Sequence, residues 1–163
     1  MLSEVLISVV ILALVTAAMA VGIRTAVITY HEIDDAAAAE MLLSTTMNML
    51  RDEIADASAV ELEAGAADGT KTLSYRDGQG GVNKCLCMGT LPADPAVPEI
   101  LLTIGSADPV KLIPDRTATN DMHAEYADVE LGDGVVTFTE LKIMRDGKEF
   151  AGIDRYSVRT VDR

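Results

Sequence analysis

The sequence predicts an α+β protein. We expect a long N-terminal α-helix, apolar in its first half, with an antiparallel β-sheet domain packed on its C-terminal half. Three observations predict this class. Residues 5–23 carry no formal charge, and neither proline nor glycine occurs in residues 23–64. Beyond them, short stretches of alternating apolar and polar residues are separated by glycines and other turn residues, which is typical of β-hairpins.

The first segment has the length and composition of a membrane-spanning helix. At about 1.5 Å per residue, the run from Val5 to Ile23 spans roughly the hydrocarbon core of a bilayer. Arg24 closes the run. Glu4 stands out, because an unpaired carboxylate costs a few kcal/mol if it enters lipid. It either lies at the level of the lipid headgroups or pairs with the amine of Met1, in its own chain or in a neighbouring copy.

The stretch from Ser3 to Leu14, in which Glu4 precedes an uninterrupted apolar run, resembles the mature N-terminus of type IV pilins and pseudopilins. Two departures from the family pattern are visible. Glu4 lies one position closer to the N-terminus than the family's acid does. The usual proline near the end of the apolar segment is absent, and Gly22 is the candidate for a local melting point in its place, because glycine weakens a helix interior by about 1 kcal/mol.

The resemblance implies a structural subunit that polymerises through its apolar helix into a type IV pilus or a similar extracellular filament of identical subunits. It also implies a prepilin peptidase that processes the precursor, methylation at Met1, and an assembly ATPase and a platform protein that extract the single-pass subunit from the membrane. Glu4 would then neutralise the Met1 amine of an adjacent subunit. Two alternatives stay open. One is a minor pseudopilin of a type II secretion or DNA-uptake system, and the other is a membrane-anchored extracytoplasmic binding domain that never polymerises.

The composition narrows the choice of partners. The net charge is −13, with 26 acidic against 13 basic residues, whereas a nucleic-acid partner would require a basic face. Aromatic residues make up 4% of the chain and tryptophan is absent, so a carbohydrate-binding groove with aromatic platforms is not expected.

A stripe of residues at steps of three and four predicts that the helix continues to about Ser58. The stripe consists of Val27, Tyr30, Ile33, Ala37, Met41, Ser44, Met47, Leu50 and Ile54. We expect Leu43, Met47, Leu50 and Ile54 to lie against the sheet, and the Asp34-Asp35 and Asp52-Glu53 pairs to face solvent. The chain then divides into a membrane or filament-core segment (1–24), an amphipathic continuation of the helix (25–58) and a β-rich head (59–163).

Strands are predicted throughout the head, at 60–63, 70–75, 82–88, 100–104, 110–113, 127–131, 135–144 and 148–161. Tight turns are expected at Asp77-Gly78, at Gly132-Asp133-Gly134 and at Asp146-Gly147. Pro92, Pro95 and Pro98 indicate a loop, and so does the polar stretch 116–122. The apolar alternation of the strand at 135–144 slips between Phe138 and Leu141, which suggests a bulge.

Two cysteines, Cys85 and Cys87, are expected on the same face of a strand. Outside the cytoplasm they form either an uncommon, strained disulfide or two small half-buried residues. With only His31, expected exposed on the helix, and His123, expected in a loop, they fall short of a zinc site.

The sequence carries no recognised motif for catalysis, phosphate binding or an EF-hand loop. We therefore expect neither an enzyme nor a cofactor. Asp128, Glu130 and Asp133 lie near two glycines and are weak candidates for a Ca²⁺ site, since Ca²⁺ prefers several oxygen ligands.

Overall fold

A computed structural model describes residues 2–64, 71–78, 81–91, 94–114 and 121–160. The predicted positions Met1, Thr70, Pro92 and Val161, and residues 116–120 of the predicted polar loop, lie outside these ranges. The chain divides into two compact units, Met1–Ala37 and Ala38–Arg163. The predicted α+β class is confirmed: a long N-terminal helix is followed by antiparallel strands that pack on its C-terminal part.

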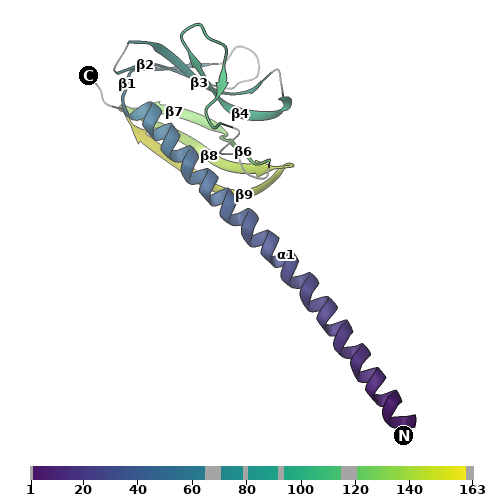
Figure 1. The fold of residues 1–163 in the computed structure, drawn as a ribbon. Coiled ribbons are helices and arrows are strands. Elements are labelled where there is room, and N and C mark those ends of the chain that lie inside the picture. The colour runs from purple at the N-terminus through teal and green to yellow at the C-terminus, as the bar shows by residue number, and fades with distance from the viewer. Residues whose placement is uncertain (1, 65–70, 79–80, 92–93, 115–120, 161–163) are drawn as a thin grey trace. The chain divides into compact units, whose positions relative to one another are not determined.

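Helix α1 covers Leu2–Ala55 (Figure 1). It ends before the predicted end at Ser58, because Ala57 and Ser58 already pair with β2 residues. Ala57 is also buried, so the backbone gains more as the start of a strand than as a last helical turn. The helix passes through Gly22 without a break, and a Cβ atom built on Gly22 would meet nothing within 4 Å.

The strands of the described residues form two antiparallel sheets. The first has the order β1-β2-β3-β4-β5. Its strands are β1 (Ala57–Ala64), β2 (Lys71–Asp77), β3 (Asn83–Leu91), β4 (Asp94–Ile104) and β5 (Val110–Lys111). In the second sheet, β8 (Val135–Arg145) pairs with β6 (His123–Glu125), β7 (Asp128–Gly132) and β9 (Lys148–Arg159).

The core lies within the unit Ala38–Arg163 and draws on the helix and both sheets. Its fully buried side chains include Leu50 and Ile54 from α1, Leu73 and Leu86 from the first sheet, and Phe138 from the second. Because one hydrophobic cluster contains residues of all three layers, the last turns of α1 are part of the head and not a separate stalk.

The buried face of α1 differs from the predicted stripe. Leu50 and Ile54 are fully buried as expected, and Leu43 and Met47 are half-buried. The remaining large apolar members of the stripe, Val27, Tyr30, Ile33 and Met41, are exposed. The face that meets the sheets consists of Ala39, Leu42, Thr46, Leu50 and Ile54. Periodicity shows that a helix has apolar faces, but it does not say which one a sheet will cover.

The three predicted turns have the expected places between strands. At Asp133-Gly134 and at Asp146-Gly147 both residues have positive φ (51° and 69°, then 53° and 73°). Two consecutive left-handed residues form the type I′ turn that matches the twist of antiparallel strands. The turn at Asp77-Gly78 ends β2, and the amide of Asp77 bonds to the carbonyl of Val82 across it.

The prolines do not form the expected loop, because Pro95 and Pro98 lie within β4. They are tolerated because the register between β3 and β4 shifts there: Gly89 is opposite Glu99, whereas Leu91 is opposite Asp94. Between those pairs β4 has surplus residues that need not donate to the ladder, and proline is accepted at such irregularities.

The change of face in β8 is confirmed by burial, since Val136 and Phe138, and then Leu141 and Ile143, are fully buried. Its backbone cause differs from the predicted bulge. Glu140 adopts a left-handed conformation (φ 49°), while the pairing of β8 with β9 keeps its register on both sides of it. The register shift lies further on, between Ile143 and Met144.

Candidate functional site

The N-terminal part of α1 is apolar and exposed. An 18-residue apolar segment of the helix has a mean hydropathy of 2.7, and none of that segment is buried. By length and composition the helix could cross a membrane. Its polar side chains fit such a surrounding: the hydroxyls of Ser8 and Thr16 donate to the carbonyls of Glu4 and Leu12 at 2.8 and 3.0 Å. Hydroxyls that bond within their own helix lower the cost of placing them in lipid.

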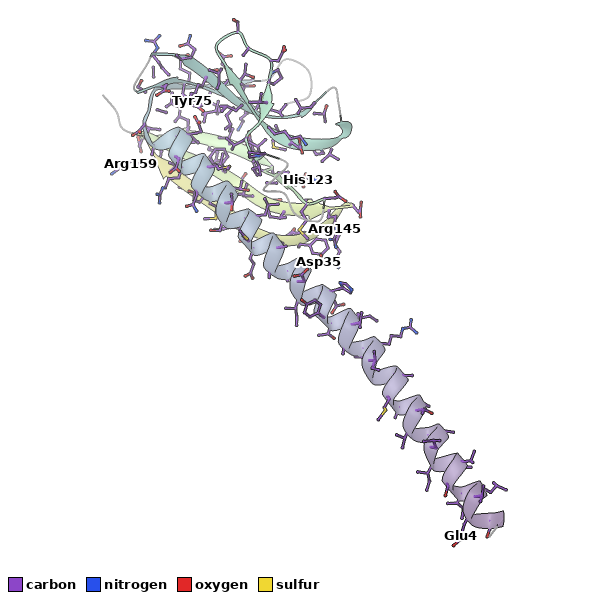
Figure 2. The ribbon with its side chains drawn as sticks, in the orientation of Figure 1. Glu4, Asp35, Tyr75, His123, Arg145 and Arg159 are labelled. Carbon is purple, nitrogen blue, oxygen red and sulfur yellow. The ribbon has the colours of Figure 1, made fainter. Side chains whose placement is uncertain are left out.

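Glu4 lies in the first turn of α1 and is exposed (Figure 2). A carboxylate in a first helical turn is favoured by the amides that lack intrahelical partners there. Met1, whose amine is the predicted partner of Glu4, lies outside the described residues. His31 is exposed as predicted, with its ring edge-on to Tyr30 at 6.3 Å between centroids.

A polar cluster joins the C-terminal part of α1 to the first sheet, and sequence reasoning missed it. The Lys84 ammonium lies 2.8 Å from a Glu53 carboxylate oxygen and 3.5 Å from Asp77. The Tyr75 hydroxyl donates to the same Glu53 oxygen at 3.1 Å. The Lys84 side chain is only 16% exposed. The prediction that Asp52 and Glu53 both face solvent is therefore wrong for Glu53, because neighbouring helix residues point about 100° apart.

The charges of this cluster support one another. Desolvation lowers the pKa of Lys84, but its hydrogen bond to Glu53 and the charges of Glu53 and Asp77 outweigh this, so the pKa lies above its ordinary value. Burial, together with the charge and hydrogen bond of Glu53, raises the pKa of Tyr75. A signal for the cluster was present in the sequence: Lys84 alternates with Leu86 and Met88, which places a lysine on an inward-facing strand position.

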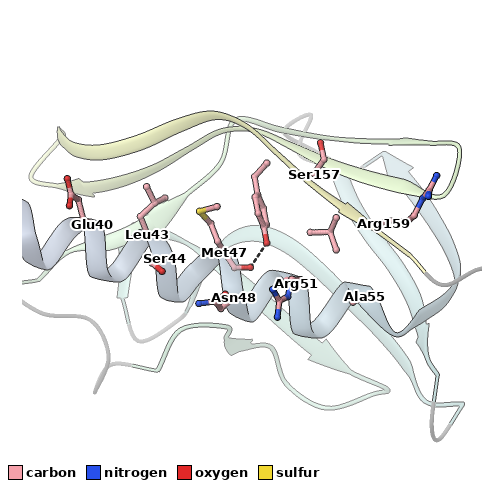
Figure 3. Close-up of a pocket in the computed structure, with 11 residues that line it drawn as sticks. Glu40, Leu43, Ser44, Met47, Asn48, Arg51, Ala55, Ser157 and Arg159 are labelled. Carbon is pink, nitrogen blue, oxygen red and sulfur yellow. Dashed lines mark hydrogen bonds between the residues drawn. The ribbon is translucent and has the colours of Figure 1, made fainter.

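A groove of about 590 Å³ runs between α1 and β9 (Figure 3). The Tyr156 hydroxyl lies in it and donates to the carbonyl of Met47 at 2.7 Å. The lining combines apolar side chains with Arg51 and Arg159. It consists of Glu40, Leu43, Ser44, Met47, Asn48, Arg51 and Ala55 from α1, and of Tyr156, Ser157, Val158 and Arg159 from β9. Such a groove can hold an apolar or acidic segment of a partner, but it brings together no recognisable catalytic set.

The expected Ca²⁺ site is wrong. Asp128 pairs with the Lys71 ammonium at 2.7 Å, and Glu130 lies 3.4 Å from Arg155. Asp128 and Asp133 are separated by the length of β7, about 17 Å at the rise of an extended strand. Among the described residues, no group of three or more His, Cys, Asp and Glu side chains could hold a metal ion. Sequence proximity misled because an extended strand carries neighbouring carboxylates apart.

No disulfide joins Cys85 and Cys87, and both are half-buried. They lie on β3, which is paired on both sides with β2 and β4. Two residues apart on such a strand, their Cβ atoms are roughly 6–7 Å apart, beyond the reach of a disulfide. The alternative of two small half-buried residues therefore holds. His123 lies in β6 and not in a loop, because its neighbours Met122 and Ala124 are buried.

Comparisons with protein-family models, with curated proteins and with solved structures find no match for this chain.

Proposed function

We propose that this protein is a pilin-like structural subunit, which polymerises through the apolar N-terminal part of α1 into a type IV pilus or a similar filament. The observation that carries the proposal is a membrane-length apolar helix that is wholly exposed and has one acid, Glu4, in its first turn. Among the described residues of the unit Met1–Ala37, no element other than the helix is present to cover that surface. The surface therefore needs lipid, or a column of like helices.

The energetics favour exchange of lipid for neighbouring helices once a subunit leaves the membrane. At ~25 cal/mol per Å², burial of most of the apolar surface of such a helix is worth on the order of tens of kcal/mol before entropy is counted. In that dry surrounding Glu4 would pair with the Met1 amine of an adjacent subunit. A buried pair of this kind selects the register of subunits more than it adds stability.

The proposal is tested by Glu4→Ala in cells that make the chain. We expect the variant to insert into the membrane but to give no filaments in material sheared from the surface, as judged by electron microscopy. Glu32→Ala changes an exposed glutamate of the same helix beyond the apolar segment and is the matched control. Mass spectrometry of filaments formed by the chain without substitutions should find a methylated Met1.

The groove between α1 and β9 favours a second candidate, the membrane-anchored binding domain that never polymerises. Its residues Arg51 and Arg159 offer positive charge on a chain of net charge −13. On that interpretation Glu4 is dispensable, the protein stays in the membrane fraction, and no filament contains it. Normal filaments from Glu4→Ala would remove the role proposed for Glu4.

A further inference from the structure

Two thiols lie on the same face of β3, the face of the first sheet that is turned away from the core. Leu86 is fully buried in the core, and successive side chains of a strand alternate between its two faces. Cys85 and Cys87, its neighbours on either side, therefore both point away from the core, and both are half-buried. Neither the proposed filament nor the groove between α1 and β9 makes use of this pair.

The surroundings of the two thiols differ. The Ser74 hydroxyl lies 3.6 Å from the Cys85 sulfur, and a polar hollow of about 320 Å³ borders Cys85. Cys87 is paired in register with Leu101 of β4, whose side chain is only 4% exposed. An ion can therefore approach Cys85 through the hollow and be partly shielded from water beside Cys87.

The spacing of the two sulfurs is wrong for a disulfide and suits a bridge through a metal ion. The Cβ atoms are roughly 6–7 Å apart, whereas a disulfide needs about 3.8 Å. At about 2.3 Å per metal–thiolate bond, an ion held between two sulfurs places them roughly 4.6 Å apart. Side chains that lean toward each other reach that separation without a change in the backbone. Because β3 is paired with both β2 and β4, the strand keeps the spacing fixed.

We propose that Cys85 and Cys87 form a two-coordinate binding site for Cu(I). Thiolates are soft ligands that favour soft cations such as Cu(I), and Cu(I) accepts two sulfurs in a line. Zinc fits poorly, because its structural sites have four ligands and no group of three or more candidate ligands is present among the described residues. The inference goes beyond the proposed function, since it concerns the head and is measured without filaments.

Binding exchanges two protons for one ion. Each thiol loses its S–H proton to solvent, two S–Cu bonds form, and copper stays in the +1 state, so the bound group carries one negative charge. The hollow beside Cys85 adds no net charge against it. Its charged lining residues are the acidic Glu61 and Glu63 and the basic Arg76 and Lys84.

The site is tested by anaerobic titration of the full-length chain in nonionic detergent with Cu(I), in competition with bicinchoninate. We expect one Cu(I) per chain, an affinity that does not depend on protein concentration, and two sulfurs per copper by X-ray absorption. Cys85→Ser and Cys87→Ser should each weaken binding by at least about 100-fold, because loss of a ligand costs more than the 10–100-fold typical of an outer partner. An equal amount of Zn²⁺ should not displace the copper.

A matched control keeps two thiols in each chain but separates them. Ser44 is exposed on α1 and lines the groove against β9, so Cys87→Ser with Ser44→Cys moves the second thiol to another part of the head. We expect this double variant to bind Cu(I) as weakly as Cys87→Ser alone. Far-ultraviolet circular dichroism is recorded for every variant, and affinities are compared among those whose spectrum matches the chain without substitutions.

Two results would overturn the inference. Binding by Cys87→Ser, or by the double variant, as tight as in the chain without substitutions would mean that separate thiols hold the copper. An affinity that rises with protein concentration would mean that the ion bridges two copies. Filament formation enters neither measurement, so failure of the copper site leaves the pilin-like function intact, and failure of that function leaves the copper site intact.

Discussion

Replacement of Lys84 by methionine is the sharpest test of how the head is joined to the helix. The change keeps most of the side-chain volume and removes the ammonium group. That group lies 2.8 Å from a Glu53 carboxylate oxygen and 3.5 Å from an Asp77 carboxylate oxygen. Glu53 would then keep the Tyr75 hydroxyl as a partner while its side chain is only 24% exposed. We expect the variant to leave a desolvated negative charge without a compensating cation.

The magnitude follows from the partial burial. Loss of one partner from a fully buried ion pair costs about 3–5 kcal/mol, whereas an exposed pair is worth about 0–1 kcal/mol. With both side chains mostly buried, we expect Lys84→Met to lower the free energy of unfolding by roughly 2–3 kcal/mol. Adding Glu53→Gln should recover about 1 kcal/mol or more of that loss, because the buried charge is then absent.

The assay is chemical denaturation of the full-length chain in a nonionic detergent, followed by near-ultraviolet circular dichroism of the tyrosines. Lys142→Met is the matched control, because Lys142 pairs with Glu140 at the same 2.8 Å but Glu140 is 57% exposed. We expect no measurable change from it. A loss below about 0.5 kcal/mol for Lys84→Met, or simple additivity with Glu53→Gln, would refute the reasoning.

The pH dependence of the same pair has a definite sign. The pKa of Lys84 is raised in the folded state, so the folded state holds this proton more tightly than the unfolded chain does. The stability that the pair contributes is complete below the pKa of the unfolded lysine. It is lost as the pH rises through the folded value. Lys84→Met should therefore flatten the alkaline limb of the stability profile.

Three further predictions concern the head. Tyr126→Phe removes a buried hydroxyl that has no hydrogen-bond partner among the described residues, so we expect unchanged or slightly higher stability, by up to ~1 kcal/mol; a clear loss would mean that the hydroxyl is hydrogen-bonded. Gly147→Ala should lower the free energy of unfolding by about 1 kcal/mol. The reason is its φ of 73°, because a Cβ atom there would meet nothing within 4 Å. Gly132→Ala has the same free space and no positive φ, so it should cost much less in the same thermal melt. The hydrogen bond from Lys71 lowers the pKa of Asp128. The stability that Asp128 contributes is therefore present above its pKa in the unfolded chain and is lost as the pH falls through its pKa in the folded protein. Asp128→Asn should reduce the slope of stability against pH on the acid side, and an unchanged slope would contradict this.

Local patterns were enough for most of the fold. The helix followed from uninterrupted helical spacing, and the hairpins followed from Asp-Gly pairs between alternating strands. These features depend on interactions between residues close in the chain, such as left-handed φ angles at a turn or hydrogen bonds one helical turn apart.

Other features depended on residues far apart in the sequence. Glu53 was expected to face solvent, but it meets Lys84 from β3, and Asp128 was expected near a metal ion, but it meets Lys71 from β2. Each pairing depends on which strands lie beside which, and charge patterns along the chain do not contain that information. The prolines of β4 predict a loop from sequence alone for the same reason. A strand accepts them here only because its pairing with β3 is irregular at that point.

Residue patterns along the chain are sufficient to predict one long helix, apolar in its first part and amphipathic in its second, followed by an antiparallel β head. Which face of the helix the head covers depends instead on how the sheets pack. Two apolar faces are present on α1. Within the unit Ala38–Arg163 the head covers the one with Leu42 and leaves Met41, a member of the predicted stripe, exposed. The physical reason is that periodicity fixes the angle between side chains on a helix, whereas burial is decided by the sheet that packs against it.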